Sequence, residues 1–269
     1  MQKFITANGT ALRIDDRGEA PTTLVLLHGY LESLDIWEEF ADRLSPQYRI
    51  LSIDIPGHGI SQVTGEVHTM EYIADTLKGV LDRQNVPRCF VAGHSMGGYA
   101  ALAFADRYPE AVQGIVLLHS TPDADTEEKK ANRRREIELV RNDKKKLIAR
   151  LFAPKGFAEE NRRRLGGHIA GLEESIQMTD DDGIVALLNG MMLRSDRNDR
   201  LRTLHIPTLF VFGRHDEFIP AETAERIAAG HPEAETAWLD RSGHMGFIEE
   251  PDTTADLVRS FIERHADAE

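Results

Sequence analysis

The sequence is poor in the features that mark several classes of protein. It has one cysteine, Cys89, in 269 residues, which excludes an intrachain disulfide and a cysteine-based metal cluster. Basic residues are outnumbered, since 32 Lys or Arg stand against 45 Asp or Glu and give a net charge of −13. A general nucleic-acid binder needs a basic surface. We therefore expect no nucleic-acid partner.

Long apolar segments are also missing. The longest unbroken apolar run, residues 99–105, is far shorter than the roughly 20 residues that cross a membrane. The first residues contain no apolar stretch of the kind that marks a secretory signal. Hydrophobic residues still make up 41% of the chain, which is enough for a large core. These features predict a globular, cytoplasmic protein with no membrane span.

Short runs of Val, Ile and Leu alternate with amphipathic helical patterns along most of the chain. We expect strands at residues 3–6, 12–15, 23–27, 48–53, 89–93, 114–118, 208–212 and 236–239. Most of these runs are almost entirely apolar, which is typical of a parallel sheet covered on both faces. Asn8-Gly9 separates the first two runs and is a hairpin signal, so the sheet is expected to begin antiparallel. The alternation predicts an α/β fold with right-handed crossovers.

The alternation stops between residues 121 and 203. This stretch shows helical stripes and no strand pattern, and it is too long for an ordinary loop. We expect a helical insertion over residues 121–203 and a core domain made of residues 1–120 and 204–269. Residues 129–164 of the insertion hold 14 Lys or Arg against 5 Asp or Glu. We interpret this charge as a solvated helix face, with steering of acidic substrates as the alternative.

One motif carries the argument about chemistry. Gly93-His94-Ser95-Met96-Gly97 follows an apolar strand and begins an alanine-rich helix. The pattern G-x-S-x-G between a strand and a helix is typical of a nucleophile elbow, a sharp turn that exposes the serine hydroxyl. Such a hydroxyl needs a neighbouring base, and the base needs an orienting carboxylate. Ser95 is therefore the candidate nucleophile.

Candidates for the acid and the base follow the last two predicted strands. Asp216 and His244 lie on the loops after them, at the carboxyl edge where ligand sites of open α/β sheets occur. Glu217 and Asp240 compete with Asp216 for the role of the acid. We favour Asp216, because Glu217 then faces elsewhere and Asp240 is a strand-end residue only shortly before His244. His119 is expected to be a buried histidine at the end of a strand, with a place at the edge of the pocket as the alternative.

The negative oxygen of a tetrahedral intermediate needs backbone N–H groups aimed at it. The N–H of Met96 is the first candidate, because it lies at a helix N-terminus, where the dipole favours negative charge. The N–H of Tyr30 is the second, because the loop after His28-Gly29 offers it. Met96 and Tyr30 are thus the predicted oxyanion hole.

Taken together, these motifs resemble the α/β-hydrolase superfamily. The resemblance covers the chain outside the insertion, and it rests on His28-Gly29-Tyr30, residues 54–61 (DIPGHGIS), residues 93–98 (GHSMGG), residues 213–216 (GRHD) and residues 242–245 (SGHM). It is closest to the esterase, non-haem haloperoxidase and C–C hydrolase branches. The resemblance implies an α/β-hydrolase fold, with a mostly parallel eight-stranded sheet flanked by helices and the insertion as a helical cap. It also implies Ser95 as nucleophile, Asp216 as acid and His244 as base.

Departures from the family pattern exclude some branches of the superfamily. Haloalkane dehalogenases and epoxide hydrolases of this fold use an Asp nucleophile, where this chain has Ser95. Lipases with a His-Gly-Gly-Gly motif are not matched, because His28-Gly29 continues as Tyr30. If the insertion is a cap, some of its apolar side chains roof the site. The candidate substrate-binding residues are Phe152, Met191 and Met245.

Three hypotheses of function follow. The first is a carboxylesterase-like serine hydrolase that cleaves a small-molecule carboxylic ester and needs no cofactor or metal. The second keeps the triad and changes the reaction to C–C bond hydrolysis or to haloperoxidase-like perhydrolysis, which the shared fold and triad do not separate. The third is a receptor-like ligand-binding protein on a hydrolase scaffold, against which the intact triad argues. The expected partner is a small-molecule substrate, and a homo-oligomer is left open.

Overall fold

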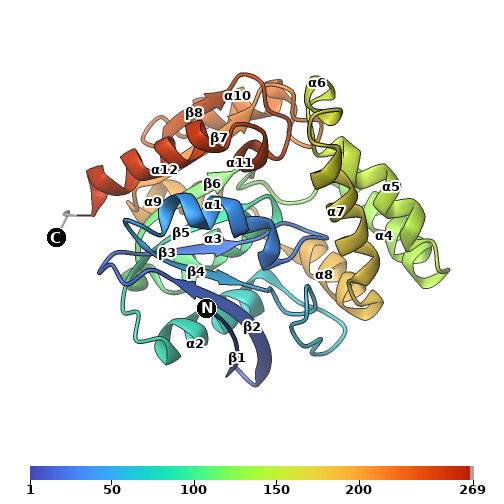
Figure 1. Cartoon of the computed structure of the whole chain (residues 1–269), viewed down its shortest axis with the longest axis horizontal. Coiled ribbons are helices and arrows are strands. Elements are labelled where there is room, and N and C mark those ends of the chain that lie inside the picture. Colours follow the sequence, from blue (N-terminus) through green and yellow to red (C-terminus); the bar gives the residue numbers. More distant parts are fainter. Residues whose placement is uncertain (267–269) are drawn as a thin grey trace.

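An eight-stranded sheet forms the centre of the molecule (Figure 1). The computed structural model describes residues 1–266. The strands lie in the order β1-β2-β4-β3-β5-β6-β7-β8. They are β1 (Gln2–Ala7), β2 (Thr10–Arg17), β3 (Thr23–Leu27), β4 (Arg49–Ile53), β5 (Cys89–His94), β6 (Val112–Leu118), β7 (Thr208–Gly213) and β8 (Glu235–Leu239). β1 and β2, and β2 and β4, pair antiparallel, and all later neighbours pair parallel. The predicted fold class, including the antiparallel start, is confirmed.

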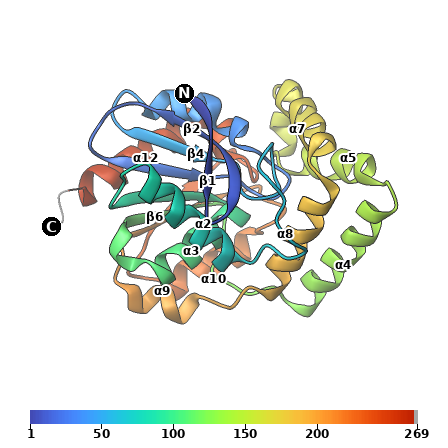
Figure 2. The ribbon, with the colours of Figure 1, turned by 90° about the horizontal axis from the view of Figure 1, so that it is seen from below.

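Helices cover both faces of this sheet, as the view from below shows (Figure 2). Outside residues 121–203 they are η1 (Leu34–Trp37), α1 (Glu38–Leu44), α2 (Met70–Arg83), α3 (Met96–Arg107), η2 (Pro109–Ala111), α9 (Asn198–Leu204, which runs across the boundary), α10 (Ala221–Gly230), α11 (Gly246–Glu249) and α12 (Pro251–His265). α2 packs beside α3, and α3 lies against β5 and β6. On the other face α1 packs against α12, which contacts β6 and β8.

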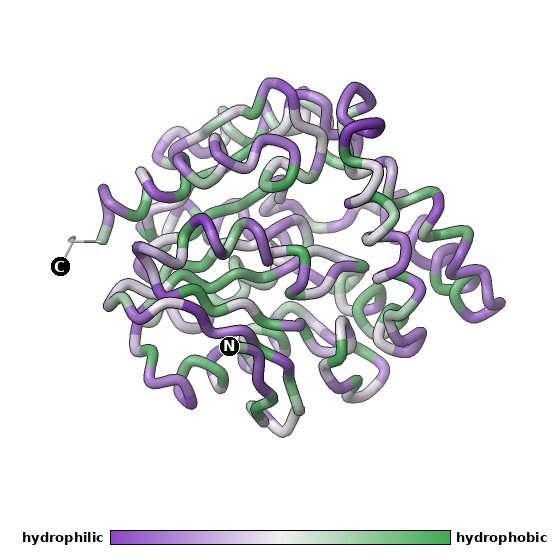
Figure 3. Tube along the Cα trace, viewed as in Figure 1, coloured by the Kyte–Doolittle hydropathy of each residue, from purple (hydrophilic) through white to green (hydrophobic). Residues whose placement is uncertain are grey.

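The core lies between these helices and the central strands. Every residue of β3, β5 and β7 is buried. Figure 3 shows the corresponding hydrophobic colour in the central strands and alternating colours along the outer helices. Burying a Val, Leu, Ile or Phe side chain stabilises the fold by roughly 1.5–3 kcal/mol. These strands are therefore a firm base for the loops at their ends.

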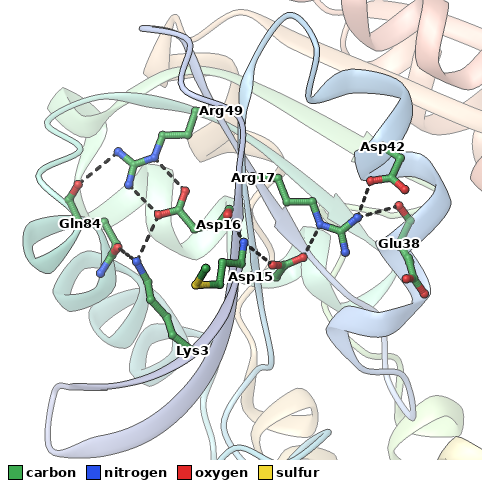
Figure 4. Close-up of polar contacts among 9 residues, drawn as sticks. Lys3, Asp15, Asp16, Arg17, Glu38, Asp42, Arg49 and Gln84 are labelled. Carbon is green, nitrogen blue, oxygen red and sulfur yellow. Dashed lines mark hydrogen bonds and ion pairs between the residues drawn. The ribbon is translucent and has the colours of Figure 1, made fainter.

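Ion pairs hold the β1–β2 hairpin against the rest of the sheet (Figure 4). Arg49 of β4 lies 2.9 Å from the carboxylate of Asp16 in β2, and Lys3 of β1 lies 3.3 Å from the same carboxylate. Arg17 of β2 reaches Asp42 of α1 at 2.5 Å. Arg49 is the first residue of β4, so this cluster lies at the end of the strands opposite the loops that carry Ser95, Asp216 and His244.

The segment between β6 and β7 forms helices and contains no strand within the described residues. Its helices are α4 (Glu127–Arg141), α5 (Lys145–Lys155), α6 (Glu159–Arg162), α7 (Gly166–Met178), α8 (Asp181–Leu193) and the start of α9. α4 packs with α8 and α5 with α7, and the four stack to one side of the sheet (Figures 1 and 2). Within residues 1–266, none of the helices has the length and apolar character needed to span a membrane.

A buried ion cluster joins the two ends of this helical insertion. The carboxylate of Asp125, which precedes α4, accepts hydrogen bonds from Arg133 of α4 and from Arg194, which follows α8, each at 2.5 Å. The Asp125 side chain is wholly buried. The guanidinium of Arg194 also stacks on Tyr99 of α3, 3.9 Å from its ring centroid. The insertion is thus attached to the body at a fixed point.

Candidate active site

Ser95 lies at the turn between β5 and α3, with φ 49° and ψ −116°. A non-glycine residue in this region is strained, and such strain collects at functional turns. The flanking glycines make the turn possible. A Cβ on Gly93 would come within 2.3 Å of the Gly97 oxygen, and a Cβ on Gly97 within 2.2 Å of the Leu27 oxygen. The motif is therefore required by close packing of strand and helix, and it leaves Ser95 partly exposed.

Asp216 and His244 come together from the loops after β7 and β8. Nδ1 of His244 lies 2.8 Å from Oδ2 of Asp216. Oδ1 of Asp216 also accepts the N–H groups of Phe218 and Ile219, at 2.8 and 2.9 Å. Burial raises the pKa of Asp216, but the neighbouring His244 and His119 outweigh burial and hold this pKa well below its usual range. An ionised Asp216 accepts a hydrogen bond from the Nδ1–H group of His244, which leaves the lone pair on Nε2 of His244 and makes that nitrogen the base.

The other two carboxylates considered for the acid lie elsewhere. Glu217 forms an exposed ion pair with Arg162, at 2.7 Å. The side chain of Asp240 is 82% exposed and lies 3.7 Å from Arg214. The structure thus places Asp216, and neither competitor, against His244.

Ser95 is connected to this pair through His94, the residue that precedes it in the chain. Nε2 of His94 lies 2.9 Å from the carbonyl oxygen of His244, and the two rings are 4.8 Å apart between centroids. Within residues 1–266, no hydrogen bond joins the Ser95 hydroxyl to the His244 ring. In enzymes without substrate, catalytic hydrogen bonds are often long and tighten in the complex. The catalytic roles of Ser95, Asp216 and His244 stay a prediction.

The two predicted oxyanion donors are backbone N–H groups without an acceptor in the described part of the chain. Met96 is the first residue of α3, so its N–H points out of the helix N-terminus. Tyr30 follows β3 on a tight loop in which Leu31 has φ 62°. Their part in an oxyanion hole is a prediction that this geometry supports.

Three aromatic rings link the base to the helical insertion. Phe218 lies 4.8 Å from His244 between ring centroids, and Phe152 of α5 lies 5.1 Å from Phe218. Tyr30 meets Phe152 edge to face at 6.0 Å, and its hydroxyl donates to Glu136 of α4 at 2.9 Å. Phe152 therefore stands between the two loops that hold the predicted base and oxyanion donor. Sequence reasoning selected Phe152 but missed Phe218.

The other two candidate substrate-binding residues are buried. Met191 lies inside α8 and Met245 lies beside Gly156, where a Cβ would come within 3.1 Å of the Met245 methyl group. Their role in substrate binding stays a prediction.

Glu249 is a further polar residue that sequence reasoning missed. Its carboxylate accepts the N–H of Gly243 at 2.7 Å on one side of His244, and the N–H of Ala158 in the insertion at 2.8 Å. The N–H of His244 itself donates to Gly156, at 2.8 Å. Glu249 thus fixes the His244 loop and connects it to the insertion. Its partner lies 91 residues away, and no local pattern in the sequence indicates this contact.

His119, Asp216 and His244 are also the one cluster of potential metal ligands among the described residues, with ligand atoms within 4.8 Å of one another. Part of their polar atoms is engaged in hydrogen bonds, whereas Nδ1 of His119 has no hydrogen-bond partner within residues 1–266. Asp216 accepts from His244 and from two backbone N–H groups, and Nε2 of His119 accepts the N–H of Gly246 at 3.2 Å. The hydrogen bonds are those of a carboxylate that orients a neighbouring imidazole.

A cleft of about 700 Å³ adjoins this site on the side of Glu32. It runs between α7 and the segment η1–α1, and its base reaches the buried side chains Glu32, Phe157 and Phe247. Apolar residues form much of its wall, and exposed carboxylates such as Glu38 lie at its rim. Ser95 and His244 do not line this cleft.

Comparison with known proteins agrees with the geometry. A model of the alpha/beta hydrolase fold matches residues 22–136. The structure of a thermophilic esterase from Thermogutta terrifontis superposes with a TM-score of 0.93 at 30% identity, over 98% of this chain and 99% of that one. The chain belongs to the α/β-hydrolase superfamily.

Other α/β hydrolases are similar along nearly their whole length. The pimeloyl-[acyl-carrier protein] methyl ester esterase of Aeromonas hydrophila is 25% identical over 260 residues, which cover 94% of this chain and 99% of that protein. The enol-lactonase from Burkholderia xenovorans LB400 has a TM-score of 0.90 at 23% identity, over 97% of this chain and 100% of the other, and shows the shared fold. The sequence prediction of this superfamily is confirmed, and its relatives include esterases.

Proposed function

We propose that this α/β hydrolase is a serine hydrolase that cleaves small-molecule carboxylic esters through an acyl-enzyme. The observation that carries the proposal is the 2.8 Å hydrogen bond between His244 and Asp216, next to the strained turn at Ser95. The backbone N–H groups of Met96 and Tyr30, which have no acceptor within residues 1–266, support it. The esterases among the relatives agree with this reaction class.

Each step uses groups already described. The Ser95 hydroxyl attacks the ester carbonyl while Nε2 of His244 takes its proton, and Asp216 stabilises the resulting imidazolium. The N–H groups of Met96 and Tyr30 bind the negative oxygen of the tetrahedral intermediate. His244 then protonates the departing alcohol. A water molecule, deprotonated by His244, attacks the acyl-enzyme, and His244 returns this proton to the Ser95 oxygen as the acid is released. The route uses no cofactor or metal.

The helical insertion serves as a cap domain in this proposal. Phe152 approaches both Tyr30 and Phe218, so the substrate meets an apolar wall next to the base. Such a wall favours an ester with an apolar group over a highly polar one. The proposed partner is accordingly a small molecule.

A panel of p-nitrophenyl esters tests this function. We expect wild-type protein to hydrolyse several of them, and Ser95→Ala to lose the activity while keeping its melting temperature. Ser52→Ala is the matched control, since Ser52 is a buried serine inside β4, outside the site. Equal activity of Ser95→Ala and wild type would contradict the proposal.

Two further assays, run beside the ester panel, separate the alternative reactions that use the same triad. Vinylogous diketones report C–C hydrolysis, and peracid formation from hydrogen peroxide and a carboxylic acid reports perhydrolysis. We expect kcat/KM for esters to exceed both. A higher kcat/KM for a diketone than for any ester would contradict the proposed ester hydrolysis and support C–C bond hydrolysis instead. Ligand binding without any turnover would instead favour a receptor-like protein.

A further inference from the structure

A buried ion pair lies directly behind the Ser95 turn. Glu32 is 1% exposed and His94 is fully buried. Nδ1 of His94 lies 3.0 Å from the Glu32 carboxylate. The same carboxylate accepts the N–H of Gly29 at 2.6 Å, and Nε2 of His94 donates to the carbonyl oxygen of His244 at 2.9 Å. None of these contacts belongs to the catalytic route described above.

The partners of His94 define its protonation state. One ring nitrogen faces a carboxylate and the other a carbonyl, and both partners are acceptors, so both nitrogens carry a proton. Burial lowers the pKa of His94, but the Glu32 charge and these hydrogen bonds outweigh burial and raise the pKa above its usual value. Burial likewise raises the pKa of Glu32, and His94 together with Gly29 reverses this and lowers it. The pair is an imidazolium and a carboxylate.

His119 shows that a buried histidine here need not be charged. It lies 3.4 Å from the Asp216 carboxylate, yet its Nε2 accepts the N–H of Gly246 and therefore holds a lone pair. Burial lowers the pKa of His119 to about 4, against the opposite influence of Asp216. The charge on His94 thus comes from its particular partners rather than from the site as a whole.

The pair connects the three segments that carry the proposed chemistry. Gly29 precedes Tyr30, whose N–H is a proposed oxyanion donor. His94 precedes Ser95, and His244 is the proposed base. The contacts span 62 residues between Glu32 and His94, and 150 residues between His94 and His244. A shift of any one segment would disturb these bonds.

We propose that Glu32 and His94 are positioning residues that hold the oxyanion loop, the nucleophile turn and the base loop in one register. This inference rests on the proposed serine mechanism. Buried ion pairs are weak evidence of stabilisation by themselves. In contrast, a displacement of about 1 Å between reacting groups can lower a rate roughly 100-fold.

Three variants separate the positioning role of the Glu32–His94 pair from the effect of its charges. Glu32→Ala removes the carboxylate, and His94→Asn keeps a donor near Glu32 but is too short to reach the His244 carbonyl. Glu32→Gln keeps the network, since its amide oxygen can accept from Gly29 and its amide N–H can donate to a neutral His94. Asp16→Asn is the matched control, because it breaks an ion pair at the opposite end of the strands (Figure 4).

Steady-state ester hydrolysis and the rate of fluorophosphonate labelling are measured for each variant, per folded molecule. We expect Glu32→Ala and His94→Asn to lower kcat and the labelling rate roughly 10- to 100-fold with KM nearly unchanged. Glu32→Gln and Asp16→Asn should stay within about threefold of wild type. A lower melting temperature with unchanged kcat in Glu32→Ala and His94→Asn would overturn the proposal. An equal loss of kcat in Glu32→Gln and Glu32→Ala would overturn it as well.

Imidazole ¹⁵N NMR tests the pair even if Glu32→Ala does not fold. We expect Nε2 of His94 to carry a proton in both wild type and Glu32→Gln, and Nδ1 to lose its proton at a lower pH in Glu32→Gln than in wild type. An unprotonated Nε2 of His94 in wild type would overturn the proposal, because His94 could then not donate to the carbonyl oxygen of His244. If wild type and Asp16→Asn show neither labelling nor ester hydrolysis, the serine mechanism itself fails, while the NMR result still stands or falls separately.

Discussion

The body and the helical insertion of this protein differ in charge, architecture and contribution to the site. Residues 121–200 hold 17 basic and 16 acidic residues, whereas the rest of the chain holds 15 and 29. The body provides Ser95, Asp216 and His244 from loops at one edge of a buried sheet. The insertion provides Phe152 and hydrogen bonds to the His244 loop. From this difference we infer that the proposed chemistry depends on the sheet of the body. The shape of the pocket depends on the helices of the insertion.

Removing the acid of the body is expected to have the largest effect. Asp216→Asn should lower kcat by roughly 10³- to 10⁴-fold, because the amide favours the wrong His244 tautomer and no longer stabilises the imidazolium. Asp240→Asn is the matched control and should keep wild-type kcat, since Asp240 is exposed at the end of β8. Steady-state hydrolysis of a p-nitrophenyl ester measures both. Comparable losses in the two variants would contradict the assignment of Asp216.

Because His119 is neutral in the fold, we expect the free energy of unfolding to decrease at acidic pH. The pKa of His119 is about 4 in the fold and about 6.5 in an unfolded chain. Between these values the unfolded state binds more protons, so this contribution to stability is present above pH 6.5 and is lost as the pH falls toward 4. The free energy of unfolding should drop by about 2 kcal/mol from pH 7 to pH 5 on this account.

Urea unfolding of wild type and His119→Asn at the two pH values checks this prediction. The drop should be smaller in the variant. His94 acts in the opposite direction. Because its pKa is raised in the fold, its contribution to the free energy of unfolding is complete below pH 6.5 and is lost as the pH rises. An unchanged pH slope in His119→Asn would show that His119 does not cause the acid limb.

The insertion should affect specificity more than chemistry. Phe152→Ala removes the ring between Tyr30 and Phe218, and should lower kcat/KM for an aromatic or long-chain ester about 10-fold while affecting acetate esters less. Leu151→Ala is the control, because Leu151 is the neighbouring residue of α5 and is 67% exposed. The same loss for every ester would assign Phe152 to folding of the insertion instead.

The smallest expected effect concerns the basic residues of the insertion. Several of them already have acidic partners, as Arg133 has Asp125 and Lys145 has Asp181. We therefore expect kcat/KM for an anionic ester, relative to a neutral one, to change less than about threefold between low and high salt. A 10-fold decrease at high salt would instead support steering of acidic substrates by the insertion.

Much of the body could be predicted from the sequence, because apolar runs and turn residues are local signals. The strands at residues 23–27 and 208–212, the hairpin at Asn8-Gly9 and the turn at Ser95 all follow from such signals. Contacts between distant segments could not be predicted. Glu32 lies 62 residues from His94, and which buried carboxylate meets which histidine depends on how the sheet brings the loops together. The same holds for Glu249 and Phe218, which have no motif around them.

The central claim is that Ser95 is the nucleophile, and covalent labelling tests it most directly. Folded wild-type protein is treated with a fluorophosphonate, digested, and mapped by mass spectrometry. We predict one adduct, on Ser95, with labelling that disappears in Ser95→Ala and is strongly slowed in Asp216→Asn. Absence of an adduct on Ser95 in folded, ester-hydrolysing protein, or undiminished labelling of Ser95→Ala at another residue, would contradict the account.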